Sequence, residues 1–480
     1  MRKSLPRIII AGLRGGSGKT TLSLGLITAL AGAGRTIVPF KKGPDYIDAG
    51  WLSAAAGRPC YNLDPFLIGR ESILSSFRDH FGDADCAVIE GNRGLYDGMD
   101  AAGTYSTAEL AKMLRAPVLL VLDCSKVTRT AAAMVCGMQQ FDKGVALRGV
   151  VLNRIAGARH EKIIREAIET YCGVPVVGAI PKLDKEFLSE RHMGLTPFQE
   201  HPEVAKALSF AAEAVRGYVD VDRVYEIARS AGPFKAAKAV TTAEAAVRRG
   251  RGPRPSSGAA VRIGVIRDTA FQFYYPENFE ELRTRGAELV EISALSAGSI
   301  PDIDALYIGG GFPETHAIAL SQNRSFRRSL RGEVEKGLPV YAECGGLMFL
   351  GKALLLDGKR YPMAGVFPLE FSLRKRPQAH GYTIVRVSRR NPYYPVGTVL
   401  KGHEFHYSQV LPAGALSGAG FAFTMQRGQG IREKQDGIWH KNVLATYTHL
   451  HAYGAPQWAD AMIRQARAHK KRRGDLSGKT

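Results

Sequence analysis

A single cysteine, Cys344, stands where an apolar run meets two glycines. Residues 338–342 have the composition of a buried strand, and Gly345-Gly346 follow the cysteine directly. A strand that ends at Cys344 and turns into a helix would hold its sulfur at the helix N-terminus, where the dipole lowers the pKa of a thiol. Buried structural cysteines are common and mostly inert, so a catalytic interpretation needs support from elsewhere in the chain.

Two other motifs supply that support. The sequence GGGFPE contains Gly310 and Gly311, whose backbone N–H groups could form an oxyanion hole. The sequence THLH follows the apolar run LATYT and offers His449 as a general base. Together with Cys344, these motifs predict a sulfur nucleophile that attacks an acyl carbon.

Other histidines compete for the role of base. His451 lies beside His449, while His403 and His406 belong to the sequence GHEFHYS, where they could instead bind substrate. A position at the end of a strand late in the chain favours His449. No cysteine or carboxylate ligands stand at a diagnostic spacing from these histidines, so a metal site is not indicated here.

A glycine-rich loop, GLRGGSGKTT, lies between the apolar run 7–11 and a helix with an apolar stripe. This order predicts a phosphate-binding loop, with Lys19 on the β- and γ-phosphates of ATP and Thr20 on Mg²⁺. The loop departs from the GxxxxGK[ST] pattern, because Leu13 stands where the first glycine is required. The candidate ATP-binding residues here are Gly15, Gly16, Ser17, Gly18, Lys19, Thr20 and Thr21.

Charged residues follow the next two strand-like runs. They are Lys41, Lys42, Asp45 and Asp48 after residues 36–40, and Glu90 and Asp97 after residues 86–89. The carboxyl edge of a parallel sheet is where such folds bind ligands, so we expect phosphate, magnesium or a carboxylate substrate at this edge. Glu90 has the position of the acid that orients Mg²⁺ or its water.

The first half of the chain alternates strands and helices. Residues 117–123, 147–154 and 175–182 read as strands, separated by helices at 130–141 and 160–171. This alternation predicts a parallel, doubly wound α/β sheet with right-handed crossovers. Two further ATP-binding candidates, Asn153 and Pro181, stand at strand ends and are expected beside the adenine.

The sequence predicts a second α/β domain after a basic linker. The segment GRGPRPSSG lacks periodicity, and a strand much like the first restarts at residue 261. A helix is expected at 315–336, before the Cys344 strand. The expected organisation is an ATP-binding domain at 1–230, a linker at 231–260, a second catalytic domain at 261–465 and a basic tail at 466–480.

Composition limits the class of protein. The 480 residues are 45% hydrophobic, and the six cysteines form no CxxC pair, which fits a reducing cytoplasm. No run approaches about 20 apolar residues, so we expect a soluble protein with no membrane span. The net charge of +20 favours a small polyanionic partner. No nucleic-acid partner is expected, because no helix-turn-helix, zinc finger or aromatic RNA-binding signature is found. A nucleic-acid-associated P-loop protein stays an alternative that only the net charge suggests.

As a set, these motifs resemble the cobyrinate a,c-diamide synthase family. The motifs are GGSGKTT, FKKGPDYIDAGW, EGNRGLYDG, YIGGGFPE, AECGGLMFLG, GHEFHYS and THLH, and the resemblance spans roughly residues 7–465. The N-terminal half is also similar to dethiobiotin synthetase. The C-terminal half is similar to a class I glutamine amidotransferase of the cobyric acid synthase type.

The resemblance implies a role for each candidate. Cys344 would attack L-glutamine, His449 would activate it, and Gly345 would join the glycine loop in the oxyanion hole. ATP would phosphorylate a substrate carboxylate, and ammonia would displace the phosphate to form an amide. The implied magnesium ligands are Thr20, Asp45 and Glu90, with Lys41, Lys42, Asp48 and Asp97 near ATP, metal or substrate. His451 falls where ordinary class I glutaminases have a glutamate, which leaves the third triad member open.

Several alternatives stay open. Relatives amidate siroheme or nickel-sirohydrochlorin instead of cobyrinate, and the shared motifs do not choose among these tetrapyrroles. Asn92-Arg93 stand where many cobyrinate enzymes have small or apolar residues. A regulatory P-loop ATPase with an inert glutaminase-like domain is a second hypothesis, which the joint retention of GGGFPE, Cys344 and THLH argues against. The sequence also leaves a homodimer open.

Overall fold

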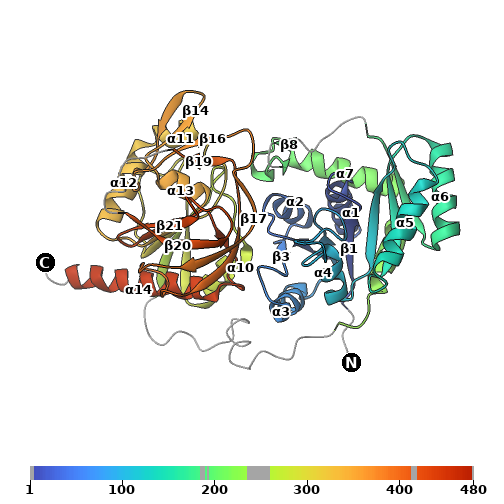
Figure 1. Cartoon of the computed structure of the whole chain (residues 1–480), viewed down its shortest axis with the longest axis horizontal. Helices are drawn as coiled ribbons and strands as arrows, with labels where there is room; N and C mark the ends of the chain where they lie inside the picture. Colours follow the sequence, from blue (N-terminus) through green and yellow to red (C-terminus); the bar gives the residue numbers. More distant parts are fainter. Residues whose placement is uncertain (1–4, 184–189, 192–193, 235–259, 412–418, 478–480) are drawn as a thin grey trace. The chain divides into compact units, whose positions relative to one another are not determined.

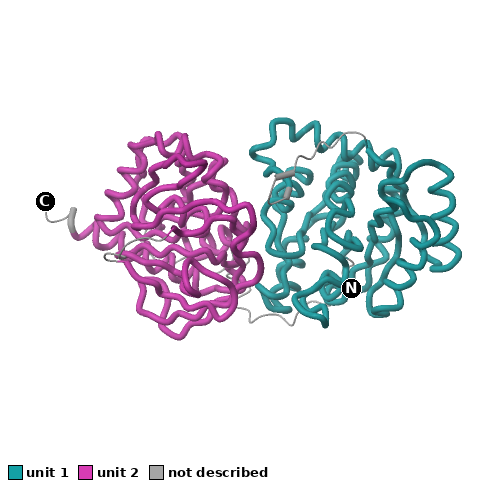
Figure 2. Tube along the Cα trace, turned by 45° about the horizontal axis from the view of Figure 1, so that its top comes forward, with its two compact units in different colours: residues 1–239 teal, residues 240–480 magenta. Residues whose placement is uncertain are grey.

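The computed structural model describes residues 5–183, 190–191, 194–234, 260–411 and 419–477. The chain forms two compact units, residues 1–239 and 240–480, which Figure 2 shows in teal and magenta. Most of the expected basic linker, residues 235–259, lies outside the described residues. Within the described part of the chain, no helix combines the length and the apolar character that crossing a bilayer requires.

The first unit is built on a parallel sheet, as predicted, and this sheet has seven strands. The strand order is β3-β2-β4-β1-β5-β6-β7. Every residue of β1, β2 and β4 is buried, as expected for a sheet covered on both faces. The strands are β1 (Arg7–Gly12), β2 (Ile37–Lys42), β3 (Tyr61–Leu63), β4 (Cys86–Glu90), β5 (Val118–Asp123), β6 (Leu147–Ile155) and β7 (Val176–Pro181).

Helices link these strands (Figure 1). Because β1, β2, β4, β5 and β6 pair in parallel, their carboxyl ends lie at one edge of the sheet. Helix α1 packs against α2 and α7. The helices are α1 (Lys19–Gly32), α2 (Ile47–Ala56), α3 (Arg70–Phe81), α4 (Thr107–Leu114), α5 (Thr130–Phe141), α6 (Ala158–Cys172), α7 (Val204–Tyr218) and α8 (Val221–Arg229). The charged residues predicted at strand ends therefore share one edge of the sheet.

The second unit has a ten-stranded mixed sheet in the order β11-β10-β12-β13-β22-β21-β20-β17-β18-β23. The first five strands run parallel and the others antiparallel. They are β10 (Val261–Ile266), β11 (Ala287–Ile292), β12 (Ala305–Ile308), β13 (Val340–Glu343), β17 (Ala379–Val387), β18 (Val399–His406), β20 (Gly420–Arg427), β21 (Gln435–His440), β22 (Val443–Thr446) and β23 (His449–Leu450). A smaller sheet contains β14 (Ala353–Leu356), β15 (Lys359–Pro362), β16 (Glu370–Leu373) and β19 (Ser408–Val410).

Helices of the second unit include α10 (Pro276–Thr284), α11 (Ala317–Gln322), α12 (Arg324–Glu335), α13 (Gly345–Leu350) and α14 (Pro456–Ser477). Helix α14 runs through the boundary expected between domain and tail at residues 465 and 466. Trp458 and Ala466 are buried in its packing against the sheet, and Arg473 donates a hydrogen bond to the Ile303 carbonyl at 3.0 Å. The first part of the expected tail is therefore part of the folded unit.

Candidate functional site

The glycine loop after β1 has the conformation that a phosphate-binding loop needs. Gly18 precedes α1 with φ 96°, a left-handed conformation that favours glycine. The Asn153 amide donates to the Ser17 carbonyl at 2.9 Å, and a Cβ on Gly18 would lie 2.2 Å from that amide nitrogen. The Lys19 ammonium donates to the Arg14 carbonyl at 3.1 Å. The Asn153 side chain therefore stabilises this conformation of the loop.

A pocket of about 830 Å³ opens beside this loop. The predicted residues that line it are Gly16, Gly18, Lys19, Thr20, Thr21, Asp48, Asn153 and Pro181. Gly15 and Ser17 belong to the same loop. The pocket lining also includes five residues that were not predicted from the sequence: Lys126, Arg154, His160, Lys182 and Phe210. The pocket combines phosphate-binding backbone, cations and apolar surface, as a nucleotide requires.

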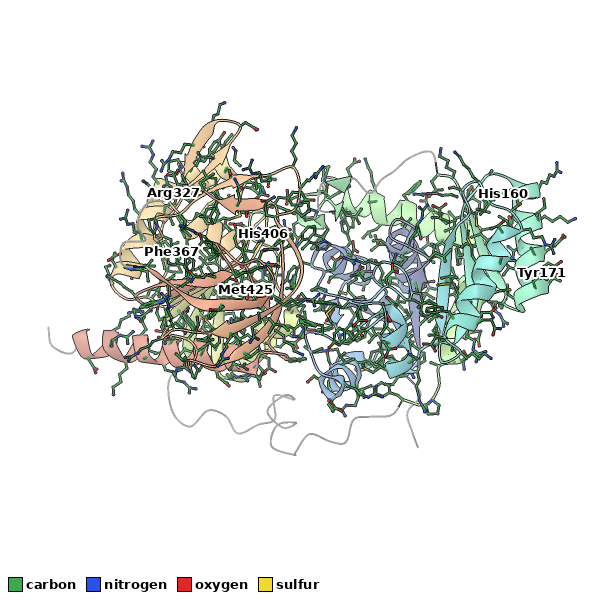
Figure 3. All side chains as sticks on the ribbon, in the orientation of Figure 1. His160, Tyr171, Arg327, Phe367, His406 and Met425 are labelled. Carbon is green, nitrogen blue, oxygen red and sulfur yellow. The ribbon has the colours of Figure 1, made fainter. Side chains whose placement is uncertain are left out.

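His160 holds two loops of this pocket together. Its Nδ1 accepts a hydrogen bond from the Ala156 N–H at 3.1 Å, so its Nε2 donates to the Val127 carbonyl at 2.6 Å. The histidine lies near the start of α6 (Figure 3). Its ring thus ties the loop after β5 to the loop after β6.

A buried lysine organises the carboxylates at the ends of β2 and β4. The Lys41 ammonium lies 2.7 Å from Asp48 Oδ2 and 2.8 Å from Glu90 Oε1. Burial alone would lower the pKa of Lys41, but the charges of Asp48 and Glu90 outweigh it and raise that pKa well above its usual range. Burial, reinforced by the neighbouring Asp48, raises the pKa of Asp45 to about 7.

The predicted magnesium ligands fit a cation. The Thr20 hydroxyl donates to Glu90 Oε1 at 2.9 Å, whereas the buried Oε2 of Glu90 has no hydrogen-bond partner among the described residues. Asp45 lies on the adjoining loop, where its Oδ1 accepts the Asp48 N–H at 2.9 Å. No three His, Cys, Asp or Glu side chains in the described ranges form a metal cluster. This suits Mg²⁺, which takes one or two carboxylates and completes its shell with water and phosphate oxygens.

The remaining predicted charges adjoin the same edge. Lys42 is buried, and burial lowers its pKa. Asp97 Oδ2 accepts the Gly94 N–H at 2.8 Å, and the Leu95 N–H of that loop donates to the Gly12 carbonyl at 2.8 Å. The loop after β4 is thus attached to the phosphate loop.

Asp123, at the end of β5, forms an ion pair with the phosphate loop. It was not predicted from the sequence. Asp123 Oδ2 lies 3.0 Å from Arg14 and 2.9 Å from Arg154. Burial opposes ionisation of Asp123, but hydrogen bonds from Ser125 and the two arginines outweigh it and lower the pKa to about 2. Asp123 therefore stays ionised and fixes two cations beside the nucleotide pocket.

In the second unit, the strand-to-helix turn expected at Cys344 is present. Cys344 follows β13 with φ 49° and ψ −100°, a strained conformation for a residue other than glycine, and it caps α13. Its N–H donates to the Thr446 carbonyl at 2.8 Å. The expected lowered pKa is wrong for the resting thiol. Burial first, and then the charge of Glu314, raises the pKa of Cys344, so the sulfur needs a base.

The predicted oxyanion-hole glycines come together beside Cys344. A Cβ on Gly345 would lie 3.0 Å from the Gly311 nitrogen. The Gly310 carbonyl accepts the Phe273 N–H at 3.1 Å, which fixes the loop. A Cβ on Gly310 would lie 2.6 Å from His449 Cε1 and 3.3 Å from Nε2. The His449 ring therefore packs directly on the glycine loop.

His449 contacts a carboxylate that the sequence analysis did not predict. Its Nδ1 lies 3.1 Å from Glu343 Oε2, and both side chains are buried. The His403 ring stacks on the His449 ring with centroids 4.9 Å apart, and burial lowers the pKa of His403 well below its usual range. His451 instead lies 3.4 Å from Glu277 Oε1. The motif AECGG placed Glu343 beside the nucleophile, but gave no sign of this contact.

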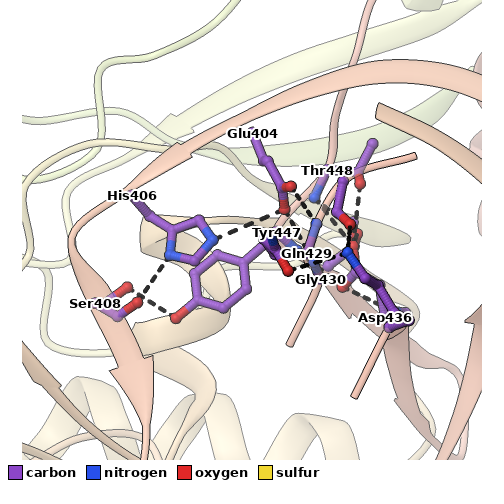
Figure 4. Close-up of polar contacts among 12 residues, drawn as sticks. Glu404, His406, Ser408, Gln429, Gly430, Asp436, Tyr447 and Thr448 are labelled. Atoms are coloured by element: carbon purple, nitrogen blue, oxygen red, sulfur yellow. Dashed lines mark hydrogen bonds and ion pairs between the residues drawn. The ribbon is translucent and has the colours of Figure 1, made fainter. Parts of the chain in front are cut away.

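His406, another candidate, belongs to a polar network shown in Figure 4. Its Nδ1 lies 2.8 Å from the Ser408 carbonyl, and its ring stacks on Tyr447 at 3.6 Å. Asp436 accepts hydrogen bonds from the Thr446 hydroxyl at 2.6 Å and the Tyr447 N–H at 3.0 Å. The network fixes the turn between β22 and β23, and hence the backbone that leads to His449.

Comparison with known proteins matches both units. Residues 8–195 match the CobQ/CobB/MinD/ParA nucleotide binding domain, and residues 262–456 match the CobB/CobQ-like glutamine amidotransferase domain. A cobyrinate a,c-diamide synthase from Magnetococcus marinus is 44% identical over 96% of this chain and 97% of its own length. The chain belongs to the cobyrinate a,c-diamide synthase family. Synthases from Archaeoglobus fulgidus and Listeria innocua are 40% and 38% identical, over 96% and 94% of this chain and 98% and 97% of their own lengths.

As a member of the cobyrinate a,c-diamide synthase family, the chain is an ATP-dependent carbon–nitrogen ligase with glutamine as amido donor. The nucleotide pocket and the Lys41 cluster lie in the first unit, and Cys344 with its glycines lies in the second. Each unit therefore contains the functional groups for one half of such a reaction.

Proposed function

We propose that this chain converts the a and c acetate carboxylates of cobyrinate to amides, at the expense of ATP and glutamine. The observation that carries this proposal is the similarity to cobyrinate a,c-diamide synthases over nearly the whole of both chains, 96% and 97% for the Magnetococcus relative. The net charge of +20 suits a polycarboxylate substrate.

In the glutaminase half, Cys344 Sγ attacks the carboxamide carbon of glutamine. His449 takes the thiol proton and returns it to the departing ammonia. The N–H groups of Gly311 and Gly345 stabilise the oxyanion. Water then hydrolyses the thioester to glutamate. The close packing of His449 on the Gly310 loop supports this assignment.

In the ligase half, a substrate carboxylate oxygen attacks the γ-phosphorus of ATP, and ADP leaves. The resulting acyl phosphate is a better electrophile than the carboxylate, so ammonia attacks its carbonyl carbon and displaces phosphate. Lys19 and the phosphate-loop N–H groups bind the phosphates. The side chains of Thr20, Asp45 and Glu90 would hold Mg²⁺, which supplies charge neutralisation at the transferring phosphoryl group.

The deciding experiment offers cobyrinate, siroheme and nickel-sirohydrochlorin in parallel to the full-length protein with ATP, Mg²⁺ and glutamine. Mass spectrometry follows the products, because each amidation exchanges OH for NH₂ and lowers the mass by that difference. We expect two successive decreases on cobyrinate. Amidation of only one of the other tetrapyrroles would overturn the proposed substrate while leaving the chemistry intact.

The matched control is Lys19→Met, which removes the phosphate-loop ammonium. This variant should lose amidation of every tetrapyrrole, with either glutamine or ammonia as nitrogen source. It should still hydrolyse glutamine, because Cys344 and His449 lie in the other unit. Unchanged amidation by Lys19→Met would contradict the assigned nucleotide site.

A further inference from the structure

Glu343 is a fully buried carboxylate beside the glutaminase base. It is the last residue of β13 and directly precedes Cys344. Its Oε2 lies 3.1 Å from His449 Nδ1, and its Oε1 accepts the Leu450 N–H at 3.3 Å. One carboxylate therefore contacts both the side chain of the base and the backbone that follows it.

Tyr307 completes the surroundings of this carboxylate. Its hydroxyl donates to Glu343 Oε2 at 3.3 Å and accepts from the Asn278 amide, also at 3.3 Å. Asn278 in turn donates to the Leu450 carbonyl at 2.9 Å. Glu343 is thus held by three groups from two strands, His449 and Leu450 of β23 and Tyr307 of β12, which fixes its position relative to His449.

This geometry selects one tautomer of His449. Glu343 Oε2 accepts the Tyr307 hydroxyl and Oε1 accepts the Leu450 N–H, so Glu343 acts as an acceptor toward His449 as well. Nδ1 therefore carries the proton and Nε2 keeps its lone pair. The ring edge that bears Nε2 faces the glycine loop, where a Cβ on Gly310 would lie 3.3 Å from it. The nitrogen able to take a proton therefore lies beside the loop that adjoins Cys344, on the ring edge whose Cε1 is nearest to Gly310.

We propose that Glu343 is the positioning residue of the glutaminase. It orients His449, fixes its tautomer and stabilises the imidazolium that forms when Cys344 gives up its proton. This inference rests on the glutaminase half of the proposed function and not on the identity of the tetrapyrrole.

The neighbouring histidine does not take this role. His451 Nε2 lies 3.4 Å from Glu277, and its Nδ1 accepts the Tyr453 N–H at 3.2 Å. The groups that face His449 are Glu343 from β13, the stacked ring of His403 from β18, and the Gly310 loop after β12. Among these contacts Glu343 supplies the carboxylate.

The test compares Glu343→Gln with Glu277→Gln in the full-length protein. Both positions are fully buried carboxylates next to a histidine of the THLH motif, and both variants keep the side-chain shape. Three quantities are measured: glutamate release from glutamine, ammonia-dependent ADP formation with the tetrapyrrole, and the rate at which iodoacetamide alkylates the Cys344 peptide across a pH series.

For Glu343→Gln we expect kcat for glutamine hydrolysis to fall roughly 10²- to 10⁴-fold with KM nearly unchanged. Alkylation of Cys344 should need a higher pH, and ammonia-dependent activity should persist. Glu343→Asp should restore part of the lost kcat. Glu277→Gln should retain kcat and the alkylation profile. These outcomes distinguish positioning from a general structural role.

The inference is overturned if Glu343→Gln hydrolyses glutamine as well as Glu277→Gln does, or if it loses ammonia-dependent activity to the same extent. If Glu343→Gln fails to fold, Tyr307→Phe replaces it, because this change removes only the hydroxyl that donates to Glu343. Tyr307→Phe should lower kcat for glutamine, and an unchanged kcat would refute the inference. Loss of activity in Cys344→Ala but not in the Glu343 variants would leave the proposed function standing.

Discussion

Lys41 and Glu90 form an ion pair in the interior of the first unit, with Nζ 2.8 Å from Oε1 and side chains only 2% and 1% exposed. The pair links the carboxyl ends of β2 and β4, where the Thr20 hydroxyl also contacts Glu90. Burying an unpaired charge is costly in free energy, so each of these two charges offsets the desolvation cost of the other. Burial raises the pKa of Glu90, and the charge of Lys41 opposes that rise at the edge where the phosphates bind.

Replacing Lys41 should therefore destabilise the first unit strongly. Lys41→Met leaves Glu90 as an uncompensated buried charge, and we expect a loss of about 3–5 kcal/mol in the free energy of unfolding. Urea unfolding measures the change. The control is Lys162→Met, because Lys162 pairs with Glu166 on an exposed helix surface at 3.8 Å. That variant should lose less than about 1 kcal/mol, and equal losses would contradict the role assigned to Lys41.

Replacing Cys344 should have different effects on amidation from glutamine and amidation from ammonia. Cys344→Ala lacks the sulfur that attacks glutamine, so glutamine-dependent amidation should be abolished while ammonia-dependent amidation continues. Both rates are followed by mass spectrometry of the tetrapyrrole. Cys86→Ala is the matched control, since Cys86 is also a buried thiol but lies in β4 of the first unit. Loss of both activities in Cys344→Ala would contradict the division of labour between the units.

Much of the fold follows from local patterns. Runs such as 7–11 and 86–89 are apolar and branched, and their alternation with helices predicts the parallel sheet of the first unit. The helix expected at 315–336 is instead two helices that meet at Asn323. The Asn323 side chain accepts the Phe326 N–H at 3.3 Å and donates to the Ala294 carbonyl at 2.9 Å. The second contact is tertiary and leaves no periodic signal.

The candidate site likewise contains residues that short motifs predict and a residue that only tertiary packing reveals. Lys19, Cys344 and His449 were predicted because their chemistry is encoded in short motifs. The contact between Glu343 and His449 joins residues 106 positions apart and exists only because β13 pairs with β22, whose chain continues to His449. Strand order is set by tertiary packing, so residues that act through such contacts escape a motif-based prediction.

The raised pKa of Asp45 predicts a pH dependence of stability. The pKa of Asp45 is about 7 in the folded chain, and its usual value is 3.8. Between pH 3.8 and about pH 7, Asp45 is therefore protonated in the folded chain and ionised in the unfolded chain. Stability therefore falls as the pH rises through this interval. Asp45→Asn keeps the oxygen that accepts the Asp48 N–H. Its free energy of unfolding, relative to that of the unmodified chain, should rise with pH up to about 7 and then level off.

Urea unfolding across this pH range measures the difference. Asp83→Asn is the control, because the side chain of Asp83 is 88% exposed. The free energy of unfolding of Asp83→Asn, relative to that of the unmodified chain, should not rise with pH. A flat profile for Asp45→Asn would mean that Asp45 is ionised in the folded chain throughout.

Removing the ion pairs of Asp123 should change the KM for ATP more than it changes kcat. Asp123→Asn removes the charge that holds Arg14 and Arg154 beside the nucleotide pocket. The Arg14 and Arg154 side chains are 71% and 44% exposed, so each pair contributes about 0.5 kcal/mol. The KM for ATP should rise about five-fold, with kcat nearly unchanged, in steady-state assays with ammonia. Asp142→Asn, which removes an ion pair with Lys112 outside the pocket lining, should leave the KM unchanged.

The contact between Gly310 and His449 allows a final test of the glutaminase geometry. Gly310→Ala places a Cβ 2.6 Å from His449 Cε1, closer than two carbon atoms approach, so the imidazole must move. A displacement of about 1 Å at a catalytic group can cost roughly 100-fold in rate. We expect such a fall in kcat for glutamine hydrolysis, with ammonia-dependent amidation intact. Gly298→Ala is the control, since its Cβ would meet no atom within 4 Å. Full glutaminase activity in Gly310→Ala would show that His449 does not act from this position.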